Sequence, residues 1–347
     1  MVIYMGHEID LKNYQIRTDL VLETIENNNS NIETKTSEHD NIKVTKVIVD
    51  SGTSTLINKK EGNYITIEFE DVTDSQNSNN VEEVFISELK ELLKELSIKE
   101  DAPVLIIGLG NEKSTPDSLG PKVIEKVLVT RHLFLIGEST SDGIRCTAAL
   151  NPGVMASTGI ETSDIVKAVV EGIKPSLVIV MDALAASSIS RINKSIQITD
   201  TGIHPGSGVG NRRKEISIDT LGVPTIGIGV PTVVESSTIV YDTINYLFKH
   251  ISYIKENQNK NKLILTRNNY LEKIKDKKLT TEEQKSILGL IGELSDIEKK
   301  NLINEVLNSI NYNFIVTPKE IDFQIDCLAE LLANGINKVL HSQESVK

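Results

Sequence analysis

Three uninterrupted runs of apolar and β-branched side chains constrain the fold of this 347-residue chain more than any other feature. They lie at residues 104–109, 177–181 and 225–230, and strands that are buried on both faces have this composition. Helical patterns at residues 119–129 and 163–173 lie between them. Because crossovers between parallel strands are right-handed and place helices on the faces of a sheet, the order predicts an α/β fold, a mostly parallel twisted sheet flanked by helices.

Segments outside these runs predict the rest of the organisation. Residues 43–50 and 64–70 alternate apolar with polar side chains, which indicates a two-stranded antiparallel ribbon at an edge. Apolar residues recur at helical spacing over residues 81–96, which predicts a helix that packs on the sheet. Beyond a Lys- and Asn-rich stretch, three further helical patterns predict that residues 256–347 form a helical C-terminal part; they cover residues 282–292, 296–310 and 318–340.

Composition and charge narrow the classes of partner. The net charge of −12 opposes binding to phosphates, and the absence of Trp together with 4% aromatic residues disfavours a stacking surface for single-stranded nucleic acid. No apolar run of about 20 residues is present, so we expect a soluble cytoplasmic protein without membrane contact. Cys146 and Cys327 are too few for a zinc site with scattered histidines, and we predict neither a metal nor another cofactor.

Two aspartates lie where an α/β sheet carries its ligands, beyond the carboxyl ends of strands. Asp117 follows the first apolar run in T-P-D-S-L-G-P, and Asp182 follows the second directly in V-M-D-A-L-A-A. Two neighbouring carboxylates cannot both ionise cheaply, so such a pair can supply a general acid and a general base for hydrolysis. The alternatives are a helix N-cap at Asp117 and a structural or metal-binding role for Asp182.

A glycine-rich stretch, D-T-G-I-H-P-G-S-G-V-G-N, occupies residues 200–211. Its glycines, Gly206 and Gly208 among them, would let backbone N–H groups approach an oxyanion, although a plain tight turn fits equally well. His204 is a candidate base or metal ligand and also a common kind of structural histidine. The cluster at residues 212–214, which begins with Arg212, could attract acidic side chains or be solvated surface.

Beyond these features, the chain strongly resembles the spore germination proteases of endospore-forming bacteria, which are atypical aspartic endopeptidases. Long blocks over nearly the whole chain carry the resemblance: R-T-D-L at 17–20, V-L-I-I-G-L-G-N and T-P-D-S-L-G-P within 104–121, L-V-T-R-H-L-F at 128–134, K-P-S-L-V-I-V-M-D-A-L-A-A at 174–186, I-Q-I-T-D-T-G-I-H-P-G-S-G-V-G-N at 196–211, and L-G-V-P-T-I-G-I-G-V-P-T-V-V at 221–234.

The resemblance implies a homotetrameric enzyme of the forespore and spore core, made as a zymogen. Such an enzyme removes its own propeptide and then cleaves small acid-soluble spore proteins after glutamate during germination. It also implies a fold like that of hydrogenase-maturation peptidases and catalytic roles for Asp117 and Asp182. By this likeness residues 1–19 are the propeptide, residues 20–347 form a single peptidase domain, and self-cleavage falls between Asp19 and Leu20, with Glu8-Ile9 as the second choice.

Ser187 departs from the family pattern, which commonly has an arginine after D-A-L-A-A. If that arginine binds the glutamate of the substrate, Arg191 or the cluster at 212–214 would have to replace it. Two rival functions stay open: a metallopeptidase that uses either aspartate with His204 as ligands, and a non-catalytic module that binds a spore protein through the glycine-rich loop.

Overall fold

A computed structural model describes residues 18–27, 32–137, 143–205, 213–257 and 273–341. These residues divide into two compact units. The larger, here called the α/β unit, contains the described residues up to Ala186, then Ser190–Val233, and those from Thr317 onward. The smaller, here called the helical unit, contains Ser187–Ile189 and the described part of Val234–Val316.

A nine-stranded sheet runs through the described residues in the order β1-β2-β3-β7-β8-β6-β4-β5, with β9 paired to β8. The strands are β1 (Thr34–His39), β2 (Ile42–Val49), β3 (Gly62–Glu68), β4 (Val104–Gly108), β5 (Thr147–Leu150), β6 (Leu177–Ala186), β7 (Ser195–Thr199), β8 (Thr225–Glu235) and β9 (Ile315–Val316). The three predicted buried runs are β4, β6 and β8, and nearly all of their residues are buried.

The sheet is mixed rather than parallel throughout. Strand β4 pairs in parallel with both β5 and β6, whereas β1, β2, β3, β7 and β8 pair antiparallel in sequence along the other side. The predicted ribbon is confirmed as β2 and β3, but β1 covers its outer edge and β7 joins it to the main sheet. The parallel part therefore carries both aspartates. Asp117 lies in the loop that follows β4, whereas Asp182 lies inside β6, so the predicted end of that strand at Met181 is wrong.

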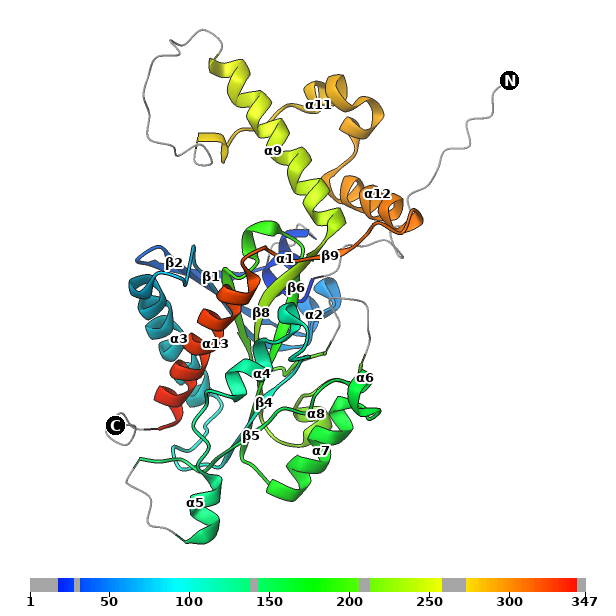
Figure 1. The fold of residues 1–347 in the computed structure, drawn as a ribbon. Helices are drawn as coiled ribbons and strands as arrows, with labels where there is room; N and C mark the ends of the chain where they lie inside the picture. Colours follow the sequence, from blue (N-terminus) through cyan, green and yellow to red (C-terminus); the bar gives the residue numbers. More distant parts are fainter. Residues whose placement is uncertain (1–17, 28–31, 138–142, 206–212, 258–272, 342–347) are drawn as a thin grey trace. The chain divides into compact units, whose positions relative to one another are not determined.

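Helices cover both faces of the sheet in the α/β unit (Figure 1). On one face, Val104, Ile106, Leu177 and Ile179 pack with α3 (Ser75–Glu95), α4 (Leu119–Ile124) and α13 (Ile321–Leu340). On the other, the alternate residues Leu105, Ile107, Val178 and Val180 pack with α7 (Thr162–Ile173). Because both faces are covered, the strands need apolar side chains at every position, which explains their unbroken runs. The α/β class with flanking helices is confirmed.

Short helices complete the α/β unit. They are α1 (Val21–Asn27), α2 (Ser51–Ile57), the 3-10 turn η1 (Thr115–Asp117), α5 (Arg131–Ile136), α6 (Met155–Thr158) and α8 (Ile218–Leu221). Helix α1 buries Val21, Leu22 and Ile25 in a small separate core with residues of β2, α2 and β3. The described segment from Thr18 onward therefore packs into the α/β unit.

The helical unit contains α9 (Ser236–Asn257), α11 (Thr281–Leu288), the 3-10 turn η4 (Gly289–Glu293) and α12 (Asp296–Ser309). Capping boxes begin two of these helices: Thr280 pairs with Glu283 at the start of α11, and Ser295 pairs with Glu298 at the start of α12. The helical C-terminal region is confirmed. Its last helix, α13, belongs to the α/β unit, because the apolar face that includes Ile325, Leu328 and Leu332 is buried in the main core.

Within the described ranges, no helix is both long and apolar enough to cross a bilayer.

Candidate active site

Asp117 lies in the turn between β4 and α4, and the local backbone fixes its place. It ends η1, and Ser118 rather than Asp117 is the residue that immediately precedes α4. The Thr232 hydroxyl of β8 donates to the Pro116 carbonyl at 2.7 Å and ties the turn to the sheet. Gly110 has φ of +116°, and a Cβ there would lie 2.0 Å from the Asp117 carbonyl oxygen. Only glycine allows this close approach.

Asp182 lies inside β6, one residue beyond the end of its pairing with β4. Gly108 of β4 pairs with Met181, and β6 continues to Ala186. The Asp182 side chain is 6% exposed, and its Oδ1 accepts a hydrogen bond from the Ala183 N–H at 2.9 Å. This carboxylate is therefore held in the sheet at the point where the neighbouring strand stops.

The two aspartates form an electrostatically coupled pair, called here the aspartate pair. Burial raises the pKa of Asp117, although the Asn111 N–H opposes the rise. Burial also raises the pKa of Asp182 well above its usual range, and the charge of Asp117 raises it further. The structure thus brings together the two side chains that the sequence selected, in surroundings that favour a shared proton.

Arg213 is the cation that faces this pair. Its charge lowers the pKa of both Asp117 and Asp182. Its Nε is buried and has no hydrogen-bond partner among the described residues. The sequence indicated only a basic cluster at residues 212–214, and the structure distinguishes its members. Lys214 pairs with Asp164 at 2.9 Å, while Gly206, Gly208 and Arg212 lie outside the described residues.

The segment around Asp19 pairs with the free part of β6. The Asp19 N–H donates to the Ala185 carbonyl at 3.0 Å, and the Ala185 N–H donates to the Asp19 carboxylate at 2.9 Å. The charge of Asp19 contributes to the raised pKa of Asp182. The next residue, Leu20, is fully buried. The bond that the sequence predicts as the self-cleavage site thus belongs to a segment docked beside the aspartate pair.

Lys59 and Gln197 hold this segment from the other side. The Lys59 Nζ donates to the carbonyl oxygens of Thr18 at 3.1 Å and Asp19 at 2.9 Å. The Gln197 amide donates to the Asp19 carbonyl at 3.3 Å and accepts from the Val21 N–H at 2.8 Å. Neither residue is recognisable from the sequence, because a lysine after a helix and a glutamine in a short strand carry no motif.

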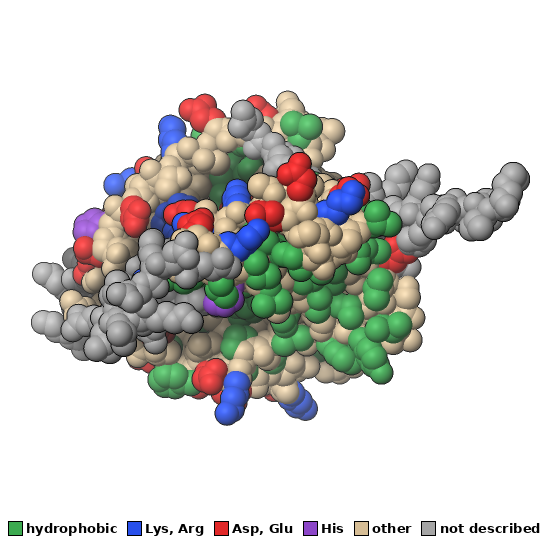
Figure 2. Space-filling model, turned by 90° about the horizontal axis from the view of Figure 1, so that it is seen from above, with side chains coloured by type: hydrophobic (Ala, Val, Ile, Leu, Met, Phe, Trp, Pro, Cys, Tyr) green, Lys and Arg blue, Asp and Glu red, His purple; other side chains and the backbone are tan. Residues whose placement is uncertain are grey.

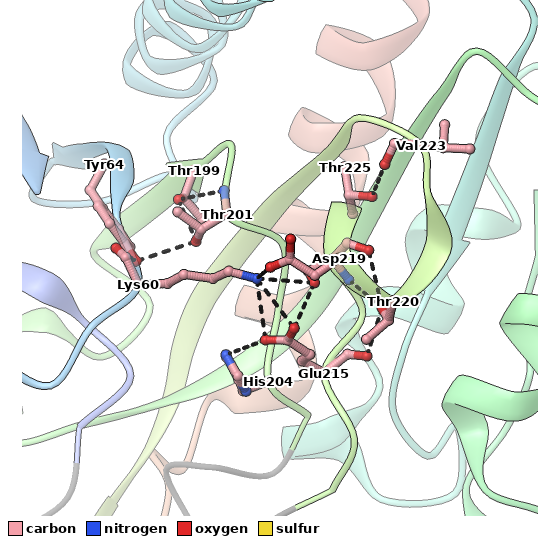
Figure 3. Close-up of polar contacts among 11 residues, drawn as sticks. Lys60, Tyr64, Thr199, Thr201, His204, Glu215, Asp219, Thr220, Val223 and Thr225 are labelled. Carbon is pink, nitrogen blue, oxygen red and sulfur yellow. Dashed lines mark hydrogen bonds and ion pairs between the residues drawn. The ribbon is translucent and has the colours of Figure 1, made fainter. Parts of the chain in front are cut away.

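His204 lies in a polar cluster at the base of the glycine-rich stretch (Figure 3). Its Nε2 pairs with Glu215 at 3.1 Å, and Lys60 contacts Glu215 and the Ser217 hydroxyl, each at 3.2 Å, as well as Asp219. Backbone hydrogen bonds between Ile203 and Ile216 close the base of the loop. These contacts anchor the two described ends of the loop, and His204 takes part in them through Glu215.

Arg191 is engaged by acids of the α/β unit. It forms ion pairs with Glu26 at 2.7 Å, Glu68 at 2.9 Å and Glu23 at 3.6 Å. Its side chain is 11% exposed. The arginine therefore ties α1 to β3.

The residues of the site can be tested against the requirements of a metal centre. Across the described ranges, no three His, Cys, Asp or Glu side chains lie close enough together to hold a metal ion. The groups that do converge are two carboxyls with raised pKa values, an arginine whose charge lowers both of those values, and a docked backbone segment. Such groups can activate water at a carbonyl carbon and return a proton to a leaving amine.

Comparison with known proteins identifies a peptidase family. The profile of the peptidase family described as "Germination protease" matches residues 9–347. The germination protease of Bacillus subtilis is 46% identical, with 97% of this chain and 96% of the relative covered. That of Priestia megaterium is 44% identical, with 98% and 97% covered. Among solved structures, the [NiFe] hydrogenase maturation protease HycI of Thermococcus kodakarensis matches at 19% identity with a TM-score of 0.26, over 42% of this chain and 80% of that one.

Proposed function

This chain belongs to the germination protease family and is therefore a peptidase of spore germination; we propose that it is an endopeptidase of atypical aspartic type, with Asp117 and Asp182 as its catalytic residues. The observation that carries the proposal is the aspartate pair. One acid comes from the turn after β4 and the other from inside β6, and burial raises the pKa of both. Perturbed, coupled acids in such a setting are typical of catalytic sites.

In the proposed reaction, the ionised member of the pair takes a proton from water as the water oxygen adds to the carbonyl carbon. The protonated member then gives its proton to the amine as the C–N bond breaks. The stronger rise in pKa at Asp182 favours Asp182 as the proton donor. The pKa of Asp117 is raised less, so Asp117 is the proposed base.

The proposed substrates are small acid-soluble spore proteins, cut after glutamate, and the segment at Asp19 serves as a guide to how they bind. Its backbone adds to the free part of β6 beyond Met181, which is the β-augmentation mode of peptide binding. Its carboxylate accepts from the Ala185 N–H, and Leu20 is fully buried. We infer that the acidic residue of a substrate takes the place of Asp19 and that the apolar residue after it takes the place of Leu20.

The same geometry supports a zymogen. While the chain is intact, residues 18–20 occupy the part of β6 that a substrate would need. Cleavage between Asp19 and Leu20 would release residues 1–19 and free that edge, leaving residues 20–347 as the proposed mature enzyme. Because the aspartate pair titrates as a unit, the rate of this self-processing should depend on pH. A rate that stays flat between acidic and neutral pH argues against this trigger.

The proposed homotetramer and location in the spore core follow from the family. Large apolar side chains are exposed on the helical unit, and Figure 2 shows hydrophobic side chains gathered on the face it views. The exposed apolar side chains of the helical unit include Tyr246, Leu247, Leu290, Tyr312 and Phe314, at 43–78% exposure. Because exposed apolar surface is typical of an interface, we propose that these side chains take part in self-association.

Digestion of a purified small acid-soluble spore protein tests the proposal. New ends should appear after glutamate, in the presence of a metal chelator as well as without it, and should be absent with Asp117→Asn. Loss of cleavage on adding the chelator would favour the metallopeptidase alternative. Complex formation without new ends would favour the non-catalytic binding module.

A further inference from the structure

The Asp19–Leu20 peptide bond is held at every polar atom. The Asp19 carbonyl oxygen accepts from Lys59 at 2.9 Å and Gln197 at 3.3 Å, and the Leu20 N–H donates to the Thr18 hydroxyl at 3.1 Å. The Gln197 side chain also accepts from the Val21 N–H and so spans the bond. The bond is fixed in one orientation before any chemistry occurs.

Lys59 reaches this carbonyl because its backbone is constrained. Helix α2 ends at Asn58, which adopts a left-handed conformation with φ of 51°. The Ser54 hydroxyl of the same helix donates to the Lys59 carbonyl at 2.7 Å. The turn directs the lysine side chain toward the docked segment, whereas its neighbour Lys60 pairs with Glu215 and Asp219. The two adjacent lysines thus bind different partners: Lys59 contacts the docked segment, and Lys60 contacts acids near the glycine-rich stretch.

We propose that the ammonium group of Lys59, assisted by the amide of Gln197, forms the oxyanion-binding site for cleavage of the Asp19–Leu20 bond. The inference rests on the proposed function, because it assigns a further catalytic residue to the self-processing reaction.

The step balances as an ordinary peptide hydrolysis. Water adds to the Asp19 carbonyl carbon and yields one proton to the aspartate pair, while an electron pair moves to the carbonyl oxygen. The Lys59 and Gln197 N–H donors already contact that oxygen, so they stabilise its negative charge without rearrangement. The C–N bond then breaks, Leu20 leaves as an amine with a proton from the pair, and Asp19 becomes a carboxyl terminus.

Charge around Lys59 supports this role. Burial lowers the pKa of Lys59, and the acids Asp19 and Glu23, which face it from the N-terminal segment and α1, oppose the lowering. The third neighbour, Gln197 of β7, is uncharged. An ammonium ion that is poorly solvated interacts strongly with a developing oxyanion. As the pH rises through the lowered pKa, Lys59 loses its charge and the reaction should slow.

The test measures loss of residues 1–19 from the full-length protein by intact mass against time. Removal of one oxyanion donor typically costs about 10²- to 10³-fold in rate, so Lys59→Met should process at least about 100-fold more slowly than the wild type. Lys46→Met is the matched control, since Lys46 is another partly buried lysine, 33% exposed, but lies against Glu88 and Glu91. It should process at the wild-type rate.

Lys59→Arg separates catalysis from folding. Arginine keeps its charge at all accessible pH values, so this variant should process. Deprotonation of the aspartate pair slows both proteins at alkaline pH, but only the wild type also loses the charge at residue 59, so the rate of Lys59→Arg relative to the wild type should rise with pH. If Lys59→Met does not fold, the pH profile of Lys59→Arg decides the question.

The outcomes distinguish the role of Lys59 from the self-processing reaction itself. Wild-type cleavage at Asp19–Leu20 with an equal rate in Lys59→Met overturns the role of Lys59 alone, and so does a ratio of the Lys59→Arg rate to the wild-type rate that does not change with pH. A wild-type chain that never loses residues 1–19, or an Asp117→Asn chain that loses them at the wild-type rate, overturns the self-processing proposal and this inference together.

Discussion

The charge of Asp117 adds to the burial that raises the pKa of Asp182. The two aspartates are separated by 65 positions in the chain, since 182 − 117 = 65, and they meet because β4 and β6 are parallel neighbours.

Asparagine at either position of the pair should leave a folded protein with little activity. A general acid or base contributes about 10²- to 10⁴-fold in rate, and we expect losses in that range for Asp117→Asn and for Asp182→Asn. The measurement is the initial rate of cleavage of a small acid-soluble spore protein. Asp242→Asn is a suitable control, because Asp242 is another acid whose burial raises its pKa, but it lies in the helical unit. Retention of most activity in Asp182→Asn would contradict the mechanism.

Asp182→Asn should also be more stable than the wild type at neutral pH. An acid whose pKa is raised in the native state binds its proton more tightly there than in the unfolded chain. Stability therefore falls as the pH rises from the ordinary carboxyl range through the raised pKa. Asparagine has no such proton, so the stability gain should grow with pH across that window. Urea unfolding from pH 4 to pH 8 would measure it, and parallel curves for the two proteins would argue against a strained carboxylate.

Removal of the charge at Arg213 should move the acid side of the pH–rate profile. Because Arg213 lowers the pKa of both aspartates, Arg213→Met should raise those values, and the base should become protonated at higher pH. As the pH is lowered, the activity of Arg213→Met should therefore begin to fall at a higher pH than the activity of the wild type. Lys214→Met tests the specificity of the effect, since Lys214 is exposed and paired with Asp164. Equal shifts in both variants would rule out a particular role for Arg213.

Gly110→Ala should disturb the site through the backbone. The φ of +116° and the approach of 2.0 Å to the Asp117 carbonyl leave no place for a Cβ. Strain of this kind costs about 1–3 kcal/mol, and relief of it would displace Asp117, so we expect lower stability together with lower activity. Gly172→Ala is the matched control, because Gly172 lies in α7 with open space around it. That change should be neutral or slightly stabilising.

The sequence predicted the buried centre of the fold better than its margins. Strands β4, β6 and β8 were recognisable because both of their faces are covered and every position is apolar. Strand β1 was not recognisable, because all six of its residues are exposed and no hydrophobic pattern marks it. Helix α13 was predicted as a helix, but its packing in the α/β unit depends on contacts with distant segments that periodicity does not reveal.

The candidate site could likewise be predicted only in part from the sequence. Asp117 and Asp182 could be selected because each follows a buried apolar run, although β6 continues through Asp182 to Ala186, so the expected strand end was wrong. Lys59, Gln197 and Ala185 could not, because their roles come from hydrogen bonds to residues about 40 or more positions away, such as the one from Lys59 to Asp19. That contact depends on where α2 ends and on how the segment at residue 19 docks on β6.

The most direct test of the central claim is the intact mass of the purified full-length protein against time, with and without chelator, beside Asp117→Asn. The account predicts that the wild type alone loses residues 1–19, at a rate that the chelator does not change. An unchanged wild-type mass under mildly acidic conditions, or equal processing in Asp117→Asn, would contradict it.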